Sequence, residues 1–144
     1  MPAMADTAIN ELLNDLLVAI YRSLVQYADE VSPWASDKAA QLQQEVTALA
    51  LRQRADVGRL TELLTARDEA VDFSFFPHEF TSLHFVSLDY LAGRLVECQR
   101  QLVQRLESSA DQLAADPQAQ ALVQKIAASQ REGLVQLLAA VPGK

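Results

Sequence analysis

Apolar residues recur at steps of three and four along four stretches of the chain, which is the spacing of one buried helical face. The first stretch shows it most fully, with Ile9, Leu12, Leu13, Leu16, Ile20, Leu24, Tyr27 and Val31. Ser32-Pro33 interrupts this stretch, and Asp116-Pro117 provides an N-cap followed by a proline that the first helical position tolerates. The pattern predicts helices over residues 7–31, 34–67, 81–110 and 117–141.

The composition supports an all-α fold. Half of the 144 residues are hydrophobic and 22% are charged, as in ordinary globular proteins. Alanine, leucine, glutamine and glutamate dominate, and these residues favour helices. We therefore expect a single domain over residues 1–144. Amphipathic helices of similar length bury their apolar faces best as a four-helix bundle.

The connection between the second and third helices is longer than the other two. Residues 68–80 reach at most about 45 Å when extended, and a helix of about thirty residues is also about 45 Å long. The short connections predict two antiparallel hairpins. The long one can cross the whole bundle, which predicts an up-down-down-up order of helices.

This connection and the start of the third helix are rich in aromatic residues. Residues 73–85, FSFFPHEFTSLHF, contain all five phenylalanines and both histidines of the chain. The phenylalanines are Phe73, Phe75, Phe76, Phe80 and Phe85. Phe73 and Phe75 alternate around Ser74, as in an extended segment with one apolar face. We expect this aromatic linker to lie along two helices and bury its rings; a partner or dimer surface and a ligand pocket are the alternatives.

Charge and cysteine content exclude several classes of function. The formal net charge of −7 argues against nucleic acid as a partner, because phosphate binding needs clustered Lys or Arg. No apolar run is long enough to span a membrane. Cys98 is the only cysteine, which favours a reducing, cytoplasmic location. Its place on the apolar stripe of residues 81–110 predicts a packed, unreactive thiol.

Polar residues interrupt two of the apolar stripes in mid-helix: Gln53 and Asp56 in the second helix, and Gln130 and Gly133 in the fourth. Two hairpins joined by a long crossover resemble the ferritin-like superfamily. In its metal-binding members the second and fourth helices carry Glu-x-x-His, and the first and third helices each add a Glu. The pattern FxxEFTSLHFVSLDYL, which begins at Phe76, also looks like that of small bacterial members of this superfamily.

The metal-binding motif of that superfamily is absent here. Neither histidine has a glutamate three residues before it, since Thr81 precedes His84 and Phe75 precedes His78 at that distance. A neutral glutamine is a poor ligand for a hard divalent ion. We therefore expect no cofactor and no catalytic residue. Instead, Gln53, Asp56 and Gln130 should form a hydrogen-bonded polar site in the core, as the relic of a metal site.

Three functional hypotheses follow. The first is a non-catalytic bundle that acts through protein contacts with an unidentified partner and as a homodimer, because the resemblance implies pairing through the first hairpin. The second is an atypical metal protein or oxidoreductase that holds iron or manganese with His84, Asp56 and Glu97. The third is a carrier of an apolar small molecule between the helices, in a cavity lined by phenylalanines.

Overall fold

The computed structural model describes residues 6–83 and 86–142, and the described part of the chain is all-helical with no strand. Its α-helices are α1 (Asp6–Tyr21), α2 (Leu24–Val31), α3 (Ala40–Ala66), α4 (Leu88–Asp111) and α5 (Pro117–Ala140). Two 3-10 helices, η1 (Asp37–Ala39) and η2 (His78–Leu83), precede α3 and α4. The predicted all-α class is confirmed. None of the described helices is both long and apolar enough to cross a membrane.

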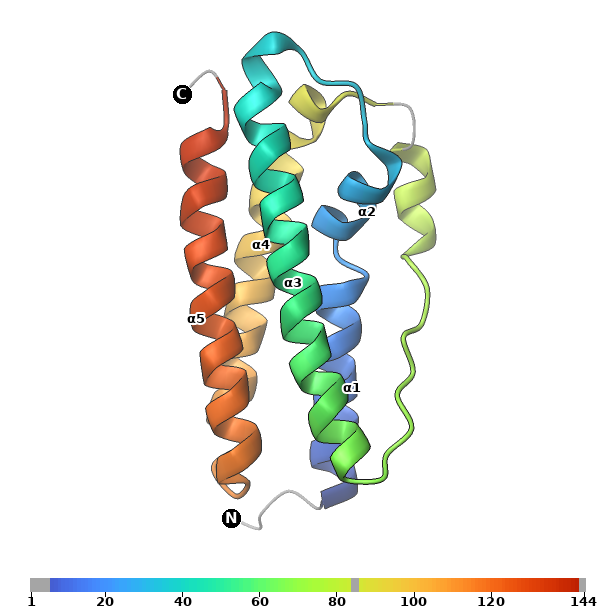
Figure 1. Ribbon diagram of the computed structural model, residues 1–144, viewed down its shortest axis with the longest axis vertical. Helices are drawn as coiled ribbons and strands as arrows, with labels where there is room; N and C mark the ends of the chain where they lie inside the picture. Colours follow the sequence, from blue (N-terminus) through green and yellow to red (C-terminus); the bar gives the residue numbers. More distant parts are fainter. Residues whose placement is uncertain (1–5, 84–85, 143–144) are drawn as a thin grey trace.

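Four long helical segments pack side by side, with α1 and α2 together forming one of them (Figure 1). Helix α5 lies against both α3 and α4, and α1 lies against α3. The core consists of two apolar clusters. One joins α1 with the C-terminal parts of α3 and α4 and the start of α5, and the other joins α2 with the starts of α3 and α4 and the end of α5.

The first predicted helix is broken, so the continuous range 7–31 is wrong. Helix α1 ends at Tyr21 and α2 begins at Leu24. Between them Ser23 has an extended backbone, and its hydroxyl accepts a hydrogen bond from the Gln26 N–H at 3.4 Å. Ser23 is therefore the N-cap of α2. Both halves keep the same buried face, which is why the apolar periodicity continues through the break.

The predicted starts of the second and third helices also need correction. Helix α3 begins at Ala40, after η1, rather than at residue 34. Residues before η1 are held instead by α4, since the Leu88 N–H donates to the Trp34 carbonyl at 2.8 Å. Helix α4 begins at Leu88 rather than residue 81, because the Ser87 hydroxyl caps it by accepting from the Tyr90 N–H. Helix α5 begins at Pro117 with Asp116 as its N-cap, as predicted.

After α3 the chain runs beside α1 and α2 until it reaches η2 (Figure 1). Asn14 pairs with the backbone of Asp72 through two hydrogen bonds of 3.0 Å. The Arg22 Nε donates to the carbonyls of Phe73 at 3.1 Å and Ser74 at 3.2 Å. These bonds attach the linker to α1. They also satisfy backbone groups of a segment that has no regular structure of its own.

Candidate functional site

Each of the four long helical segments contributes one buried glutamine to the middle of the bundle. These residues are Gln26 of α2, Gln53 of α3, Gln99 of α4 and Gln130 of α5. In α3, α4 and α5 the glutamine lies between residues of one apolar cluster and residues of the other, whereas Gln26 lies among residues of the second cluster, next to the break between α1 and α2. The glutamine cluster is therefore a polar layer between two apolar halves of the core.

Gln53 is the centre of this layer and is fully buried. Its Nε2 donates to the side-chain oxygens of Gln99 at 3.1 Å and Gln130 at 3.2 Å. Its Oε1 accepts from the Ser23 hydroxyl and from Gln26 Nε2, both at 3.1 Å. The hydrogen bond expected between Gln53 and Gln130 is therefore present. One side chain links all four helical segments.

Asp56 closes one side of the layer. It is 2% exposed, and its Oδ2 accepts from Gln130 Nε2 at 2.8 Å. Its Oδ1 accepts from Arg59 Nη1, also at 2.8 Å, and the Arg59 side chain reaches solvent. A buried carboxylate is tolerated when it is paired and hydrogen-bonded in this way. Arg59 therefore connects the buried charge to the surface.

The donor set of this layer does not fit a divalent metal ion. Asp56 is its only carboxylate among the described residues, and both oxygens already accept hydrogen bonds. The remaining side-chain donors around it are neutral amides that bond to each other. Iron and manganese sites in helical bundles need several charged carboxylates and imidazoles. Among the described residues, no group of three or more His, Cys, Asp or Glu side chains is placed so that it could hold a metal ion.

The residues of the alternative metal site are not brought together in the described part of the chain. Asp56 is in the core, whereas Glu97 lies on the exposed face of α4 and pairs with Arg100 at 3.0 Å. His84 lies outside the described residues. Gly133, which interrupts the apolar stripe of α5, is in a tight contact between α3 and α5. A Cβ added there would lie 2.4 Å from the Leu49 Cδ1.

Cys98 is half-buried and packs against the second apolar cluster, as its predicted place on the apolar stripe indicates. The neighbouring Gln99 is more deeply buried, with 1% of its surface exposed. Burial still raises the pKa of the Cys98 thiol, and the charge of Arg94 opposes this shift. A raised pKa lowers the thiolate fraction, so the cysteine is not an activated nucleophile.

The aromatic linker covers the bundle only in part. Phe80 is buried and Phe76 half-buried, and both rings pack on Tyr27, with centroid distances of 5.4 and 5.2 Å. Phe73 is 39% exposed, with its ring 5.4 Å from that of Tyr21. Phe75 is 87% exposed, so burial of all the rings is wrong.

The backbone explains the different exposure of these rings. Ser74 has a left-handed conformation, with φ of 54°, which breaks the alternation predicted for an extended segment.

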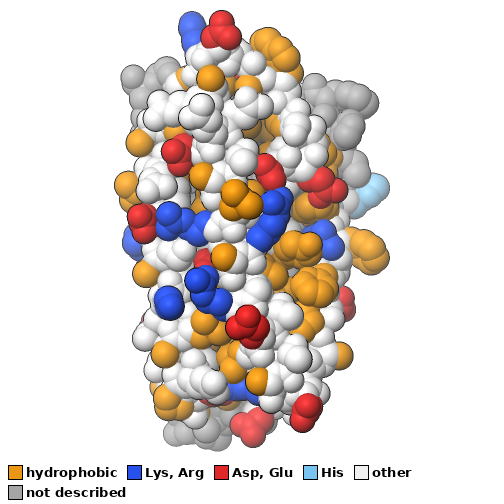
Figure 2. All heavy atoms as spheres, in the orientation of Figure 1, with side chains coloured by type: hydrophobic (Ala, Val, Ile, Leu, Met, Phe, Trp, Pro, Cys, Tyr) orange, Lys and Arg blue, Asp and Glu red, His pale blue; other side chains and the backbone are white. Residues whose placement is uncertain are grey.

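On the face drawn in Figure 2, hydrophobic side chains gather over the linker side of the molecule, with Lys and Arg side chains next to them. Phe85 lies outside the described residues.

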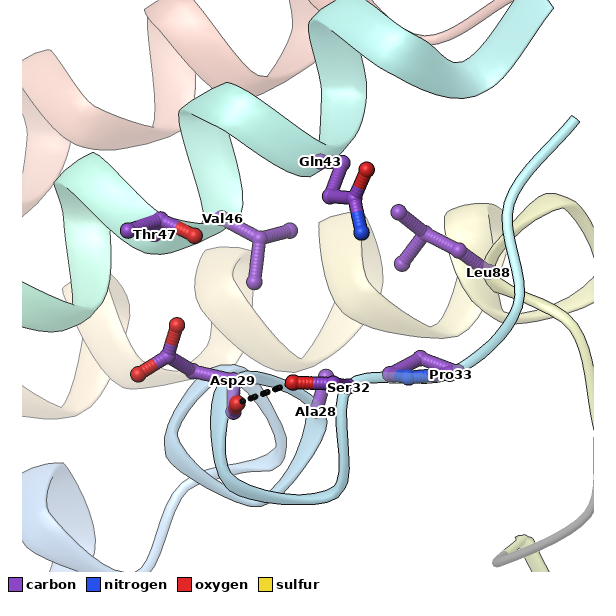
Figure 3. A pocket seen from close by; sticks show the side chains of 8 residues that line it. All are labelled: Ala28, Asp29, Ser32, Pro33, Gln43, Val46, Thr47 and Leu88. Atoms are coloured by element: carbon purple, nitrogen blue, oxygen red, sulfur yellow. Dashed lines mark hydrogen bonds between the residues drawn. The ribbon is translucent and has the colours of Figure 1, made fainter. Parts of the chain in front are cut away.

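A small pocket at the end of α2 lies between α2, α3 and α4 (Figure 3). It has a volume of about 30 Å³ and is lined by Asp29, Ser32, Gln43 and Thr47 together with apolar side chains. The Ser32 hydroxyl donates to the Asp29 carbonyl at 3.3 Å, so its proton is already used. The pocket has room for about one water molecule, and its residues do not form a nucleophile–base arrangement.

The buried layer shows which site residues sequence reasoning missed. Gln53, Asp56 and Gln130 were identified because they interrupt apolar stripes. Gln99 was missed because positions 98 and 99 fit the helical period equally well. Gln26 was missed because the break between α1 and α2, which the apolar pattern does not show, precedes it. Its Nε2 also donates to the Ala50 carbonyl at 2.8 Å.

Comparisons of the chain with protein-family models, with curated proteins and with solved structures gave no match.

Proposed function

We propose that the chain is a non-catalytic, ferritin-like helical bundle that acts through protein contacts, including contacts with a second copy of itself. In this proposal the linker along α1 and α2 is the crossover between two helical hairpins. The observation that carries it is the closed polar layer. Each helical segment directs one buried glutamine to mid-core, and every buried side-chain polar atom among the described residues has a partner.

The glutamine layer is, in this proposal, a degenerate metal site. Its amides occupy the mid-bundle position where metal-binding relatives would carry charged ligands. Neutral amides can satisfy each other without an ion, so the core gains a network linking its four helical segments and needs no metal. Such a network is stabilising only when every member is bonded, as it is here.

The surface for protein contacts is at the end of the bundle where α4 begins. Trp34 and Tyr90 are 72% and 67% exposed. The loop that carries Trp34 is fixed to α4, because the Ser36 hydroxyl and N–H donate to the Asp89 carboxylate at 2.5 and 3.1 Å. Aromatic residues are enriched at protein interfaces, and rigid ones lose little entropy on binding. The apolar face of α1, in contrast, is largely used within the chain.

Metal content tests the first half of this proposal. The purified protein is incubated with ferrous iron, manganese or zinc, passed over a sizing column and analysed for metal. We expect no stoichiometric metal in the wild-type protein, in Asp56→Asn or in the exposed-residue control Gln101→Ala. Stoichiometric metal that is lost in Asp56→Asn would show that the layer is a working site and would overturn the proposal.

Oligomeric state tests the second half. Light scattering on a sizing column should give a dimer for the wild-type chain and a monomer for the double variant Trp34→Ala, Tyr90→Ala. Val135→Ala is the matched control, because Val135 is a similarly exposed apolar residue on α5. A wild-type monomer at all concentrations, or a dimer that survives the double substitution, would rule out this surface as the site of pairing.

A further inference from the structure

An open groove of about 460 Å³ lies between the linker, the α1–α2 segment and α4. We propose that it binds a fatty carboxylate, with the aliphatic chain on its apolar wall and the carboxylate on Arg22 and Arg105. This proposal goes beyond the protein contacts proposed above and does not depend on them. The volume is within the range of small-molecule sites, which is about 300–1,000 Å³.

The wall of the groove is mainly apolar. It includes Val18 of α1, Leu24 of α2, Leu102 of α4, and Phe75 and Phe80 of the linker region. Leu24 and Phe80 are buried and form a fixed surface, whereas Phe75 leaves most of its ring in solvent. An aliphatic chain placed here would remove apolar surface of the ligand and of Phe75 from water. Removing apolar surface from water favours binding.

Two arginines line the same groove in a chain of net charge −7. Arg105 makes no ion pair or hydrogen bond with any described residue, whereas Arg52, Arg54, Arg59, Arg67, Arg100 and Arg131 each pair with a carboxylate. Arg22 is held in place by its Nε bonds to the linker, and its guanidinium lies 4.7 Å from the Tyr21 ring centroid.

The ligand class follows from this combination. A guanidinium recognises a planar carboxylate through paired hydrogen bonds, and no described residue accepts a hydrogen bond from Arg105. Glu79 also lines the groove, so the arginines outnumber the acids on its wall by two to one. A cationic amphiphile would meet two like charges there, and a purely apolar ligand would leave Arg105 unused. An aliphatic chain that ends in one carboxylate can pack on the apolar wall and also bind Arg105.

Cys98 lines the groove and is the only cysteine of the chain, so its modification reports occupancy directly. The protein is treated with a maleimide at fixed pH, with and without dodecanoate below its micelle concentration. Because thiol reactivity follows exposure, we expect dodecanoate to slow modification roughly tenfold. Dodecanol, which has the same chain without the charge, should protect only weakly. Unchanged modification rates with dodecanoate would overturn the proposal.

Calorimetry on variants then tests Arg105 and the apolar wall separately. Arg105→Gln should weaken dodecanoate binding roughly tenfold, the scale of a lost charged hydrogen bond, and should leave dodecanol unchanged. Phe75→Ala should weaken both ligands, and Arg100→Gln, outside the groove, should affect neither. Thermal unfolding confirms that each variant is folded. Equal affinity of Arg105→Gln and wild type for dodecanoate would overturn carboxylate recognition. If Cys98 becomes less reactive to maleimide as protein concentration rises in the absence of dodecanoate, a second copy of the chain occupies the groove. That result would overturn the proposal of a fatty carboxylate.

Discussion

The glutamine layer and the linker groove place polar and apolar groups in opposite ways. In the layer, polar side chains are surrounded by apolar core, and every one has a hydrogen-bond partner among its neighbours. In the groove, apolar side chains face solvent beside Arg105, which has no partner among the described residues. Both depart from the simple rule of apolar inside and polar outside, but only the groove leaves interactions unmade.

This difference indicates where function should be sought. A polar network with all its hydrogen bonds made has nothing left to offer a ligand, so its role is to hold the helices in register. Covering an exposed phenylalanine removes apolar surface from water, and Arg105 makes no ion pair with any described residue. In our proposals the interior therefore serves stability, and the linker side serves binding. The predictions below separate these roles, starting with the largest expected effect.

Gln53→Ala should be the most damaging change in the layer. It removes the partner of Ser23, Gln26, Gln99 and Gln130 at once and leaves a cavity. Since each unsatisfied buried group costs about 1–3 kcal/mol, we expect a loss of about 3–5 kcal/mol in the free energy of unfolding. Urea denaturation measures it, with exposed Gln101→Ala as the control. A loss equal to that of the control would show that the layer contributes nothing to stability.

Two phenylalanines of the same linker region give the next comparison. Phe80 is buried and packs on Tyr27, whereas Phe75 is 87% exposed. Phe80→Ala should lower the free energy of unfolding by about 3 kcal/mol, as expected for a core aromatic. Phe75→Ala should change it by less than about 0.5 kcal/mol. Thermal or urea unfolding of both variants decides the matter. Similar losses for the two would mean that Phe75 packs on the bundle in solution.

Much of the fold was predictable from the sequence, because helical periodicity is a local signal. The stripe with Leu42, Val46, Leu49, Gln53 and Asp56 is buried as its spacing indicates. The breaks between helices were less predictable. Residues 22 and 23 leave the helix where Ser23 caps α2 and also binds Gln53, thirty residues away. The apolar pattern alone does not show a contact of that kind.

The candidate sites differ in the same respect. Gln53 and Gln130 could be predicted to meet, because each interrupts an otherwise apolar stripe. The choice of Gln99 over Cys98 depends on partners in α3 and α5, since Gln99 Nε2 donates to the carbonyl and side-chain oxygens of Gln130 at 3.0 Å. The groove was harder to predict. It depends on how the linker turns at Ser74, and the left-handed backbone of Ser74 cannot be predicted from the presence of a serine.

The ion pair of Arg67 and Asp116 is intermediate between the buried glutamine layer and the exposed groove. Its side chains are partly buried and bond to each other. Hydrogen bonds from Arg67, at 2.8 and 3.0 Å, lower the pKa of Asp116 below its ordinary value, and the Ala119 N–H at 3.1 Å adds to this. A lowered folded-state pKa means that the ionised form stabilises the fold. That stabilisation is complete above the unfolded pKa and is lost as pH falls through the folded pKa.

Asp116→Asn isolates this contribution, because asparagine keeps the N-cap acceptor and removes the charge. At neutral pH the variant should be less stable by about 1 kcal/mol. The gap should close as pH falls below about 4, where the aspartate of the unfolded chain becomes protonated. Urea unfolding of both proteins from pH 7 to pH 3 measures it. Asp89, whose pKa is lowered by the Ser36 hydroxyl, remains in both proteins, so its acid dependence cancels. A gap of the same size at every pH would show that ionisation of Asp116 does not stabilise this end of the bundle.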